Sequence, residues 1–382
     1  MDIQEEIQDR FQECDYNSRV NTGKSITFHT MSSLDDIDFI KSVDRSGIGQ
    51  HLLSFPEQII DIADKCQYEA TEKDEICICG LGGSAIAGEI LAEYLHDICK
   101  CRFSVERSPF LPKWAGRRTL VIAVSYSGNT IETLAAFENA LKRKCDVVCI
   151  TSGGKLKELA LASRTQLIEV PGGLMPRVAI GYLLGATAYV IEKVASVSLI
   201  SEIKTKAKNL DAFIAELSPQ NPESSNPAKI LARRILGYVP VIYSQRGLRA
   251  LGTRWQNQIN ENAKMLAFSG EIPEMGHNQI VGWLESSSVL NFLPIFLRWS
   301  FQDPVISKVQ DTIIAMFAEK ELKPLIVDIT GNDAMDCILK GVALGDFISY
   351  YLAILKGIDP SPVNSIEELK RKSLMKLHEA YR

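Results

Sequence analysis

Apolar runs of strand length alternate with helix-like stretches along most of this 382-residue chain, and this alternation limits the folds that it can adopt. In the first half, strands are predicted at residues 75–80, 102–108, 119–127 and 146–154. Helical spacing of apolar residues is clearest at 84–98 and 130–144, directly after two of these runs. Strands that alternate with helices predict an α/β fold, in which a mostly parallel sheet is flanked by helices through right-handed crossovers.

The same pattern returns in the second half. Strands are predicted at 238–244, 288–295 and 324–330, and helices at 254–265, 303–320 and 333–357. A Ser-, Pro- and Asn-rich stretch at 216–229 is typical of a linker. We therefore expect one α/β domain at 32–215 and a second at 230–382. Residues 1–31 are polar and weakly periodic, which predicts a poorly ordered extension outside the core, and Met31 offers a second start.

Composition argues against two classes of protein. The 42 basic and 47 acidic side chains give a net charge of -5, whereas a nucleic-acid-binding protein usually presents a basic stripe or a basic domain. No run approaches the roughly 18 uninterrupted apolar residues of a membrane span. We therefore expect neither a nucleic-acid partner nor a membrane.

The nine cysteines lie mostly inside apolar runs, and no apolar signal segment opens the chain. This pattern favours a reduced, cytoplasmic protein. Cys77-x-Cys79 and Cys99-x-Cys101 are spaced too closely for a usual zinc knuckle, and no histidine cluster accompanies them. Buried cysteines without a metal are the favoured interpretation, and zinc is the alternative.

Three glycines and a serine end the first apolar run, in the sequence GLGGSAIAGE at 80–89. The spacing Gly80-x-Gly82-x-x-Ala85 fits the dinucleotide fingerprint, in which backbone N–H groups and a helix N-terminus receive a pyrophosphate. Glu106, at the end of the next predicted strand, lies about where that fingerprint has its ribose-binding acid. The turn also suits a single phosphate, so an NAD-dependent dehydrogenase is one of two alternatives.

A second turn, SYSGNT at 125–130, follows another buried run and leads directly into a helix. The hydroxyls of Ser125, Ser127 and Thr130, with N–H groups at the start of the helix, can hold one phosphate. One hydroxyl would be enough for the ligand-free alternative, a helix N-cap, so three beside a glycine favour a ligand. Both turns should meet at the carboxyl edge of one sheet, where open α/β sheets bind ligands.

Longer motifs carry a resemblance to a known family. GLGGSAIAGE, SYSGNTIET and GGLMPRVAIG resemble the sugar isomerase (SIS) domain. RWQNQINENAKMLAF, PEMGHNQIVGW and LAILKGIDPSPVNSIEELK are more specific, and they are similar to the second half of the bifunctional phosphoglucose/phosphomannose isomerase family. The resemblance extends from about residue 32 to 382 and implies two SIS-type α/β domains. It also implies an isomerase without a cofactor or metal, which converts glucose 6-phosphate, and mannose 6-phosphate, to fructose 6-phosphate.

This isomerisation opens the sugar ring and then moves a proton between C1 and C2 through a cis-enediolate. It needs a base for that proton, an acid–base group for the ring and a cation beside the developing oxygen charge. By resemblance, Glu261 is the base and Arg177 is the cation. The resemblance also implies that His277 opens the ring with help from Lys356, and that His277 reaches the neighbouring subunit's site in a homodimer.

Each of these residues also has a plainer interpretation. Glu261 could be a solvated helix residue paired with Lys264, and His277 could be a surface histidine. Arg177 could be a surface arginine, and Lys356 could be a partner of a helix dipole at a C-terminus. The family resemblance is what favours the catalytic roles.

The resemblance extends to the substrate-binding residues. Gly82, Gly83 and Ser84 are expected to line the sugar end of the pocket, while the hydroxyls of the second turn hold the phosphate. Ser349 lies seven residues before Lys356 and on the same helix face. Its small side chain would leave room for either C2 epimer, which a bifunctional enzyme requires.

Three positions depart from the family pattern. Ala87 stands where the family usually has glycine, and Gly276 and Gln279 replace the expected Asn and Glu around the histidine. The last two changes bear on the orientation of the histidine, and they leave a non-catalytic, sugar-phosphate-binding regulator as the other alternative. Two carboxylates are weaker site candidates, Glu132 beside the second turn and Glu274 as local support for the histidine.

Overall fold

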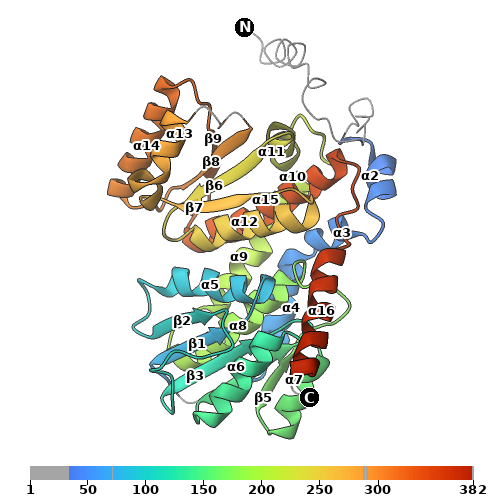
Figure 1. Cartoon of the computed structure of the whole chain (residues 1–382), viewed down its shortest axis with the longest axis vertical. Helices are drawn as coiled ribbons and strands as arrows, with labels where there is room; N and C mark the ends of the chain where they lie inside the picture. Colours follow the sequence, from blue (N-terminus) through green and yellow to red (C-terminus); the bar gives the residue numbers. More distant parts are fainter. Residues whose placement is uncertain (1–33, 71, 287–288, 290, 381–382) are drawn as a thin grey trace. The chain divides into compact units, whose positions relative to one another are not determined.

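The structure is a computed structural model that describes residues 34–70, 72–286, 289 and 291–380. The expected extension at 1–31 lies outside the described residues, and so do the first two residues of the expected first domain. In the described part, two sheets are each flanked by helices, as Figure 1 shows, and all paired strands are parallel. The predicted α/β fold class is confirmed.

The first sheet has five strands in the order β2-β1-β3-β4-β5. Its strands are β1 (Glu75–Cys79), β2 (Arg102–Glu106), β3 (Thr119–Val124), β4 (Asp146–Thr151) and β5 (Gln166–Glu169). The apolar runs predicted the first four. β5 was missed because it has only four residues, two of them polar, at the edge of the sheet.

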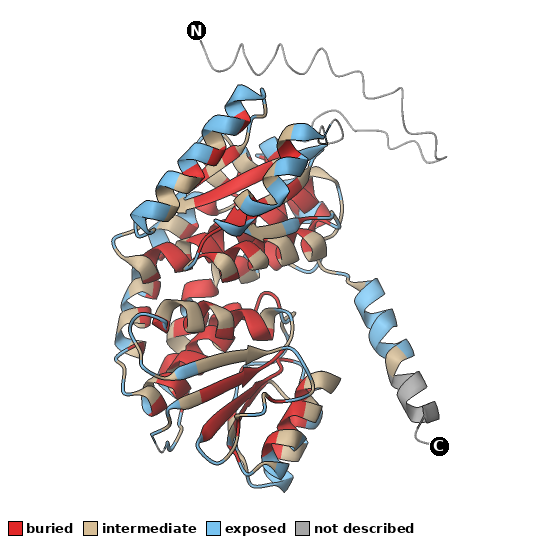
Figure 2. Ribbon diagram, turned by 60° about the vertical axis from the view of Figure 1, so that its left-hand side comes forward, coloured by how far each residue is buried: buried red, intermediate tan, exposed pale blue. Residues whose placement is uncertain are grey.

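Helices cover both faces of this sheet. In chain order the helices of the first half are α2 (Ile37–Val43), α3 (Ile48–Leu53), α4 (Phe55–Lys65), α5 (Gly83–Leu95), α6 (Ile131–Lys142), α7 (Gly154–Ala162), α8 (Ile180–Ala195), α9 (Ile200–Asn209) and α10 (Asp211–Leu217). Helices α5 to α8 contact the strands and α4 packs against α8, whereas α3 and α10 contact α15 (Ala334–Leu355) of the second half. Alternate residues of β1 point to opposite faces, so Ile76 and Ile78 pack with residues of α4, α5 and α8, whereas Cys77 and Cys79 pack with residues of α6. Figure 2 shows the resulting buried strands between partly exposed helices.

The stretch that composition marks as a linker overlaps the ends of two helices. α10 ends at Leu217 and α11 (Pro227–Ile235) begins two residues before the stretch ends. Asn226 caps α11 with its side chain, and the ammonium of the fully buried Lys229 lies 3.0 Å from Asp35 Oδ1. Buried polar side chains therefore anchor residues 226–229 to the rest of the protein.

The second sheet has four strands in the order β7-β6-β8-β9. In chain order its elements are β6 (Val239–Ser244), α12 (Arg249–Asn262), β7 (Phe268–Glu271), η2 (Glu274–His277), α13 (Gln279–Glu285), β8 (Phe292–Trp299), α14 (Pro304–Glu319), β9 (Leu325–Ile329), α15 (Ala334–Leu355) and α16 (Asn364–Ala380). β7 was missed because its sequence, FSGE, has one apolar residue. β8 extends four residues further than predicted, and residues 287, 288 and 290 before it lie outside the described part.

Helix α15 is the core helix of the second half. Its 22 residues have a mean hydropathy of 1.5 in their most apolar window, so by length and composition it could cross a bilayer. However, 89% of that window is buried inside the protein, where α15 packs against α11 and α12. At Gly345 a Cβ would lie 2.1 Å from Nε1 of Trp255, so a close contact between α12 and α15 requires glycine there.

Each sheet has one switch point, where the connections that follow two neighbouring strands run in opposite directions along the sheet. In the first sheet β1 leads to β2 and β3 leads to β4, so the switch point lies between the carboxyl ends of β1 and β3. In the second sheet it lies between β6 and β8. Ligands of open α/β sheets bind at such points. The two turns that stand out in the sequence both flank the first switch point.

Candidate active site

The glycine turn joins β1 to α5. Gly82 is the N-cap residue of α5 and has a φ of 54°, and Gly83 is the first residue of the helix. A Cβ on Gly83 would lie 3.1 Å from the carbonyl oxygen of Pro176, whereas the space beside Gly82 is open. Glycine at position 83 therefore allows the segment that carries Arg177 to lie directly against the turn.

The serine turn joins β3 to α6 and contacts the glycine turn. The backbone N–H of Tyr126 donates to the Ser84 hydroxyl at 3.4 Å. The hydroxyls of Ser125 and Thr130 lie 2.9 Å apart, while Ser127 is exposed. Thr130 is the N-cap residue of α6, but its side chain makes no capping hydrogen bond. The ligand-free alternative, in which this hydroxyl caps the helix, therefore does not hold for Thr130.

Arg177 lies between β5 and α8, and it is 3% exposed, so it is not a surface arginine. Its Nε donates to Oδ1 of Asn262 at 2.6 Å, and its Nη2 donates to the carbonyl oxygens of Pro360 and Ser361, both at 2.8 Å. Its Nη1 lies 3.7 Å from Oε2 of Glu261. Burial lowers the pKa of Arg177 and the charge of Glu261 opposes this, but an arginine remains a cation in proteins. A buried cation of the first half thus lies beside a carboxylate of the second.

Glu261 occupies the last turn of α12. Lys264, just beyond the helix, has a φ of 51° and folds back, so that its ammonium donates to the backbone carbonyl of Glu261 at 2.7 Å and to that of Pro360 at 2.9 Å. Lys264 therefore binds the backbone of Glu261, while the carboxylate lies on the Arg177 side. Burial, and then the charge of Arg177, lower the pKa of Lys264 to about 8.

Lys356 follows the last residue of α15 and contacts the end of α12. Its ammonium donates to the carbonyl of Ala263 at 2.8 Å and to that of Lys264 at 3.3 Å. Burial lowers the pKa of Lys356. The lysine thus binds the C-terminal carbonyls of a neighbouring helix, within three residues of Glu261 in the sequence.

Ser349 lies two turns earlier on α15 and is completely buried. Its hydroxyl donates to the backbone carbonyl of Asp346 at 2.7 Å and accepts from Nδ2 of Asn262 at 2.9 Å. The hydroxyl therefore binds protein groups on both sides. Asn262 thus links Ser349 to Arg177 by hydrogen bonds, and Arg177 lies 3.7 Å from Glu261 as an ion pair.

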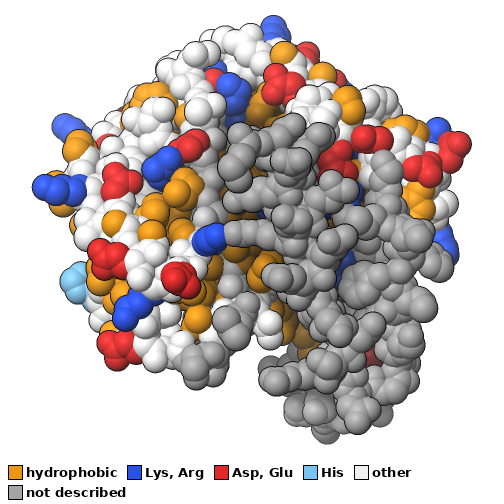
Figure 3. Space-filling view, turned by 90° about the horizontal axis from the view of Figure 1, so that it is seen from above, with side chains coloured by type: hydrophobic (Ala, Val, Ile, Leu, Met, Phe, Trp, Pro, Cys, Tyr) orange, Lys and Arg blue, Asp and Glu red, His pale blue; other side chains and the backbone are white. Residues whose placement is uncertain are grey.

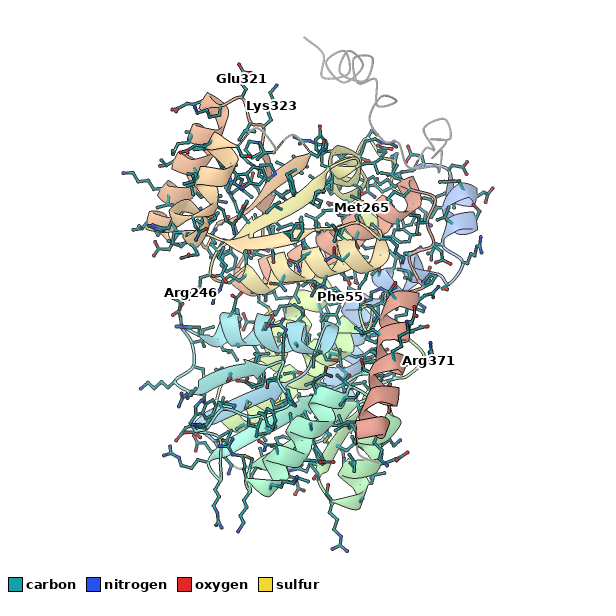
Figure 4. All side chains as sticks on the ribbon, viewed as in Figure 1. Phe55, Arg246, Met265, Glu321, Lys323 and Arg371 are labelled. Atoms are coloured by element: carbon teal, nitrogen blue, oxygen red, sulfur yellow. The ribbon has the colours of Figure 1, made fainter. Side chains whose placement is uncertain are left out.

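Helix α12 runs antiparallel to the strands of the second sheet. Near its N-terminus, Nη1 of Arg249 lies 3.3 Å from Oε2 of Glu271, the last residue of β7. Figure 4 labels Arg246, which precedes α12, and Met265, which follows it, at opposite ends of the helix. Because α12 has 14 residues, these ends are about 20 Å apart.

His277 lies at the other end of α12 from Glu261. It is exposed, and it ends η2, which follows the carboxyl end of β7. Glu261 lies at the C-terminal end of α12, and hence at the amino edge of the same sheet. Of the predicted catalytic residues, the structure therefore brings Arg177, Glu261 and Lys356 together and places His277 of the same chain at the opposite edge.

Two of the three residues that depart from the family pattern, Gly276 and Gln279, lie beside His277 in the chain, as does the candidate Glu274. Gln279 accepts a hydrogen bond from the hydroxyl of Tyr243 at 2.7 Å, which fixes the start of α13 to β6. Glu274 accepts from Nδ2 of Asn278 at 2.7 Å. Glu274 therefore supports the turn around His277 by binding its neighbour.

Two further candidates lie beside the first switch point. The carboxylate of Glu106 accepts a hydrogen bond from the Ser104 hydroxyl of its own strand. Glu132 lies in the first turn of α6, directly after the serine turn. Neither carboxylate contacts the group around Arg177 through a described hydrogen bond or ion pair.

Within the described ranges, no group of three His, Cys, Asp or Glu side chains could hold a metal ion. The eight cysteines in those ranges are free thiols, and the buried sulfur atoms of Cys77 and Cys79 are 3.8 Å apart. Acidic and basic side chains are interspersed over the visible part of the face in Figure 3.

Sequence reasoning missed what holds Arg177. Asn262 and the carbonyls of residues 360 and 361 accept three hydrogen bonds from its guanidinium. All lie inside the ENAK and K-G-x-D-P-S-P motifs, so their position beside Glu261 and Lys356 was the available signal. Every residue has a backbone carbonyl, however, so residue types alone do not show which carbonyls bind Arg177.

Sequence families match both halves of the chain. Residues 70–167 match the SIS domain, and residues 224–372 match the family described as bacterial phospho-glucose isomerase C-terminal SIS domain. The two halves of the described structure are thus SIS-type domains, as expected.

Several curated proteins are similar over most of the chain. A bifunctional phosphoglucose/phosphomannose isomerase of Caldicellulosiruptor bescii is 35% identical over 312 residues, which cover 80% of this chain and 91% of that protein. The protein of the same name from Thermoplasma volcanium is 33% identical over 326 residues, covering 84% and 99%.

A solved glucose-6-phosphate isomerase of Chlamydia trachomatis shares the fold, with a TM-score of 0.64 at 15% identity over 87% of this chain and 74% of that one. This likeness concerns the fold alone. The identity of 33–35% to the curated proteins, over 80% and 84% of this chain, carries the assignment. The chain belongs to the bifunctional phosphoglucose/phosphomannose isomerase family.

Proposed function

We propose that this protein interconverts glucose 6-phosphate and fructose 6-phosphate, and mannose 6-phosphate and fructose 6-phosphate, at the group formed by Arg177, Glu261 and Lys356. The observation that carries this is the 3.7 Å approach of the buried Arg177 guanidinium to the Glu261 carboxylate. A carboxylate can take a proton from carbon, and a fixed cation beside it stabilises the negative oxygen that this creates.

In this proposal the substrate phosphate binds the serine turn and the first turn of α6, through Ser125, Ser127 and Thr130. The glycine turn, Gly82 to Ser84, lies beside the sugar. Gly83 contacts the segment that carries Arg177, so the sugar carbons extend from the phosphate toward the arginine. Hydroxyls and N–H groups at a helix N-terminus can bind a phosphate even where the site has no basic side chain.

The proton transfer begins from the open-chain aldose. Glu261 removes the proton from C2, and the C2–H electron pair forms a C1–C2 double bond while the C1 carbonyl oxygen becomes negative. Arg177 stabilises this oxygen in the enediolate. The protonated Glu261 then returns the proton to C1, and the proton of the C2 hydroxyl passes to the negative C1 oxygen, which gives the ketose with its C1 hydroxyl. The reaction needs no electron acceptor because one carbon is oxidised as its neighbour is reduced.

Ring opening requires a second acid–base group, and we assign it to His277 with Lys356 beside the ring oxygen. Because His277 and Glu261 lie at opposite edges of the second sheet, the histidine of this site is that of a second copy in a homodimer. Closed two-fold dimers exchange such contacts symmetrically, so two equivalent sites result. A cytoplasmic location is part of the same proposal, in line with the cysteine pattern.

The test is a pair of coupled assays on the purified full chain. Fructose 6-phosphate formation from glucose 6-phosphate and from mannose 6-phosphate is measured after treatment with a chelator and without a nucleotide cofactor. Turnover of both aldoses is expected. Binding of the hexose phosphates without turnover would instead select the non-catalytic regulator, and a titration that shows NAD binding would revive the dehydrogenase alternative.

A further inference from the structure

The guanidinium of Arg177 is held from two of its three nitrogens. Nε donates to the Asn262 side chain at 2.6 Å, and Nη2 donates to two backbone carbonyls at 2.8 Å. Nη1 lies nearest to the Glu261 carboxylate, at 3.7 Å, which is too long for a hydrogen bond. The nitrogen that faces the base is therefore the one that the protein leaves to a substrate oxygen.

The contacts of Arg177 form a closed circuit. Asn262 donates to Ser349 at 2.9 Å, and Ser349 donates to the backbone carbonyl of Asp346 at 2.7 Å. The Asp346 carboxylate accepts from Arg254 at 2.6 Å, and the same Nη2 of Arg254 donates to the backbone carbonyl of Arg177 at 3.0 Å. These five residues are at most 3% exposed. Both ends of Arg177, its backbone and its guanidinium, are thus fixed through α12 and α15.

We propose that Asn262, oriented by Ser349, is a positioning residue that aims Nη1 of Arg177 at the oxygen on which charge develops. The proposal rests on the proposed isomerase function and adds the means by which its cation is oriented. An amide suits this role because its oxygen accepts from Nε while its N–H group donates to the serine.

This circuit gives Ser349 a different role from the one that its size predicts. Its hydroxyl is buried and already binds Asn262 and the α15 backbone. Ser349 then acts on the reaction through Asn262 and Arg177, and contact with the C2 hydroxyl is not required. A preorganised donor is effective because it need not reorient when the charge appears.

The test is a double-mutant cycle of Asn262→Ala and Arg177→Ala, measured as kcat and KM for both aldoses. Asn262→Ala should lower kcat about 10²-fold, because a displacement of about 1 Å can cost that much, with little change in KM. In the Arg177→Ala background the same substitution should change kcat by less than about threefold, since the group that it positions is gone. An equal loss in both backgrounds would overturn the proposal.

Asn260→Ala is the matched control, because it removes the same side chain from the same helix end. Asn260 accepts one hydrogen bond, from the Ala267 backbone at 2.9 Å, and it lies outside the circuit. It should retain wild-type kcat, and a loss equal to that of Asn262→Ala would also count against the proposal.

If Asn262→Ala does not fold, Ser349→Ala replaces it in the cycle. This variant keeps the amide but removes the hydroxyl that orients it, so a loss of about tenfold in kcat is expected, again only while Arg177 is present. A wild-type protein without isomerase activity would refute the proposed function. Wild-type activity with additive losses would refute only the positioning role.

Discussion

The two switch points of this molecule have the same topology but different contents. At the first switch point, the glycine turn has open space beside Gly82 and contacts the serine turn through the Ser84 hydroxyl. In the second sheet, the equivalent turn after β6 contains Gly247, where a Cβ would lie 2.3 Å from the ring of Trp299. Gln245 and Gln302 also bind each other across that point. The second crevice is therefore filled by the protein's own side chains.

This difference shows that strand order creates a crevice but side chains decide whether it is left open to a ligand. The second domain contributes to the site from its other edge. Glu261 and the carbonyls that bind Lys356 lie at the C-terminal end of α12, next to Arg177 of the first domain. The carboxyl edge of the second sheet carries His277, about the length of α12 away.

The largest expected effect comes from the second domain's amino edge. Glu261→Gln keeps the shape of the side chain but removes the base, so kcat should fall by about 10²- to 10⁴-fold. The KM for both aldoses should change little, because the proposed phosphate site lies at the first sheet. Steady-state kinetics on both aldoses measures this, and Glu319→Gln, at the end of α14, is the matched control. Retained kcat would exclude Glu261 as the base.

The next prediction concerns the carboxyl edge of the second sheet. In the proposed homodimer, His277→Ala and Glu261→Gln should each remove activity, but mixed dimers would place both defects in one site and leave the other intact. Random mixing after dissociation, or co-expression, should restore about a quarter of wild-type activity, with wild-type KM. If mixing restores nothing while mixed dimers are shown to form, His277 does not serve a second copy.

A smaller effect should separate the two turns. Gly83→Ala places a Cβ 3.1 Å from the Pro176 carbonyl, so the segment before Arg177 must move by a few tenths of an ångström, and kcat should fall several-fold with a small loss of stability. Gly247→Ala, at a φ of 89° and against Trp299, should lower the melting temperature by several degrees and leave kcat of the folded protein unchanged. Kinetics and thermal unfolding of both variants measure this. The reverse pattern would mean that the second turn also binds substrate.

The smallest expected effect is a pH dependence at Lys264. Its pKa of about 8 in the folded protein lies below the unfolded value of about 10.4, so between these limits the unfolded chain binds more protons. The stability of the wild type relative to Lys264→Met should therefore be constant below about pH 8 and rise from there to about pH 10. Denaturant unfolding of both proteins across this range measures it. A constant difference would show that Lys264 is not desolvated in the fold.

The sequence pattern predicted most of the fold. Residues 120–124 are entirely apolar where a parallel strand is buried on both faces, so β3 was easily found. β5 and β7 have four residues each and lie at sheet edges, where one side of the strand needs no apolar residues. Their sequences therefore resemble those of loops.

The candidate site, too, was predictable from the sequence only in part. Glycines and hydroxyls after two strands indicated a ligand at one sheet edge, because parallel strands bring their carboxyl ends together. Glu261, Arg177 and Lys356 each had a plain interpretation, and only the family resemblance made them candidates. Whether a given side chain faces a ligand depends on contacts between residues 77 or more positions apart, such as the one between Arg254 and Arg177.

By itself the sequence determined the α/β class, the two halves and the two ligand-type turns, since these follow from local periodicity and from residues next to each other in the chain. Tertiary structure alone decided that Arg177 is buried with one nitrogen toward Glu261, that Ser349 binds Asn262, and that His277 lies at the far end of α12. The physical reason is that burial and hydrogen bonding depend on which distant segments pack together, and a local pattern contains no record of that packing.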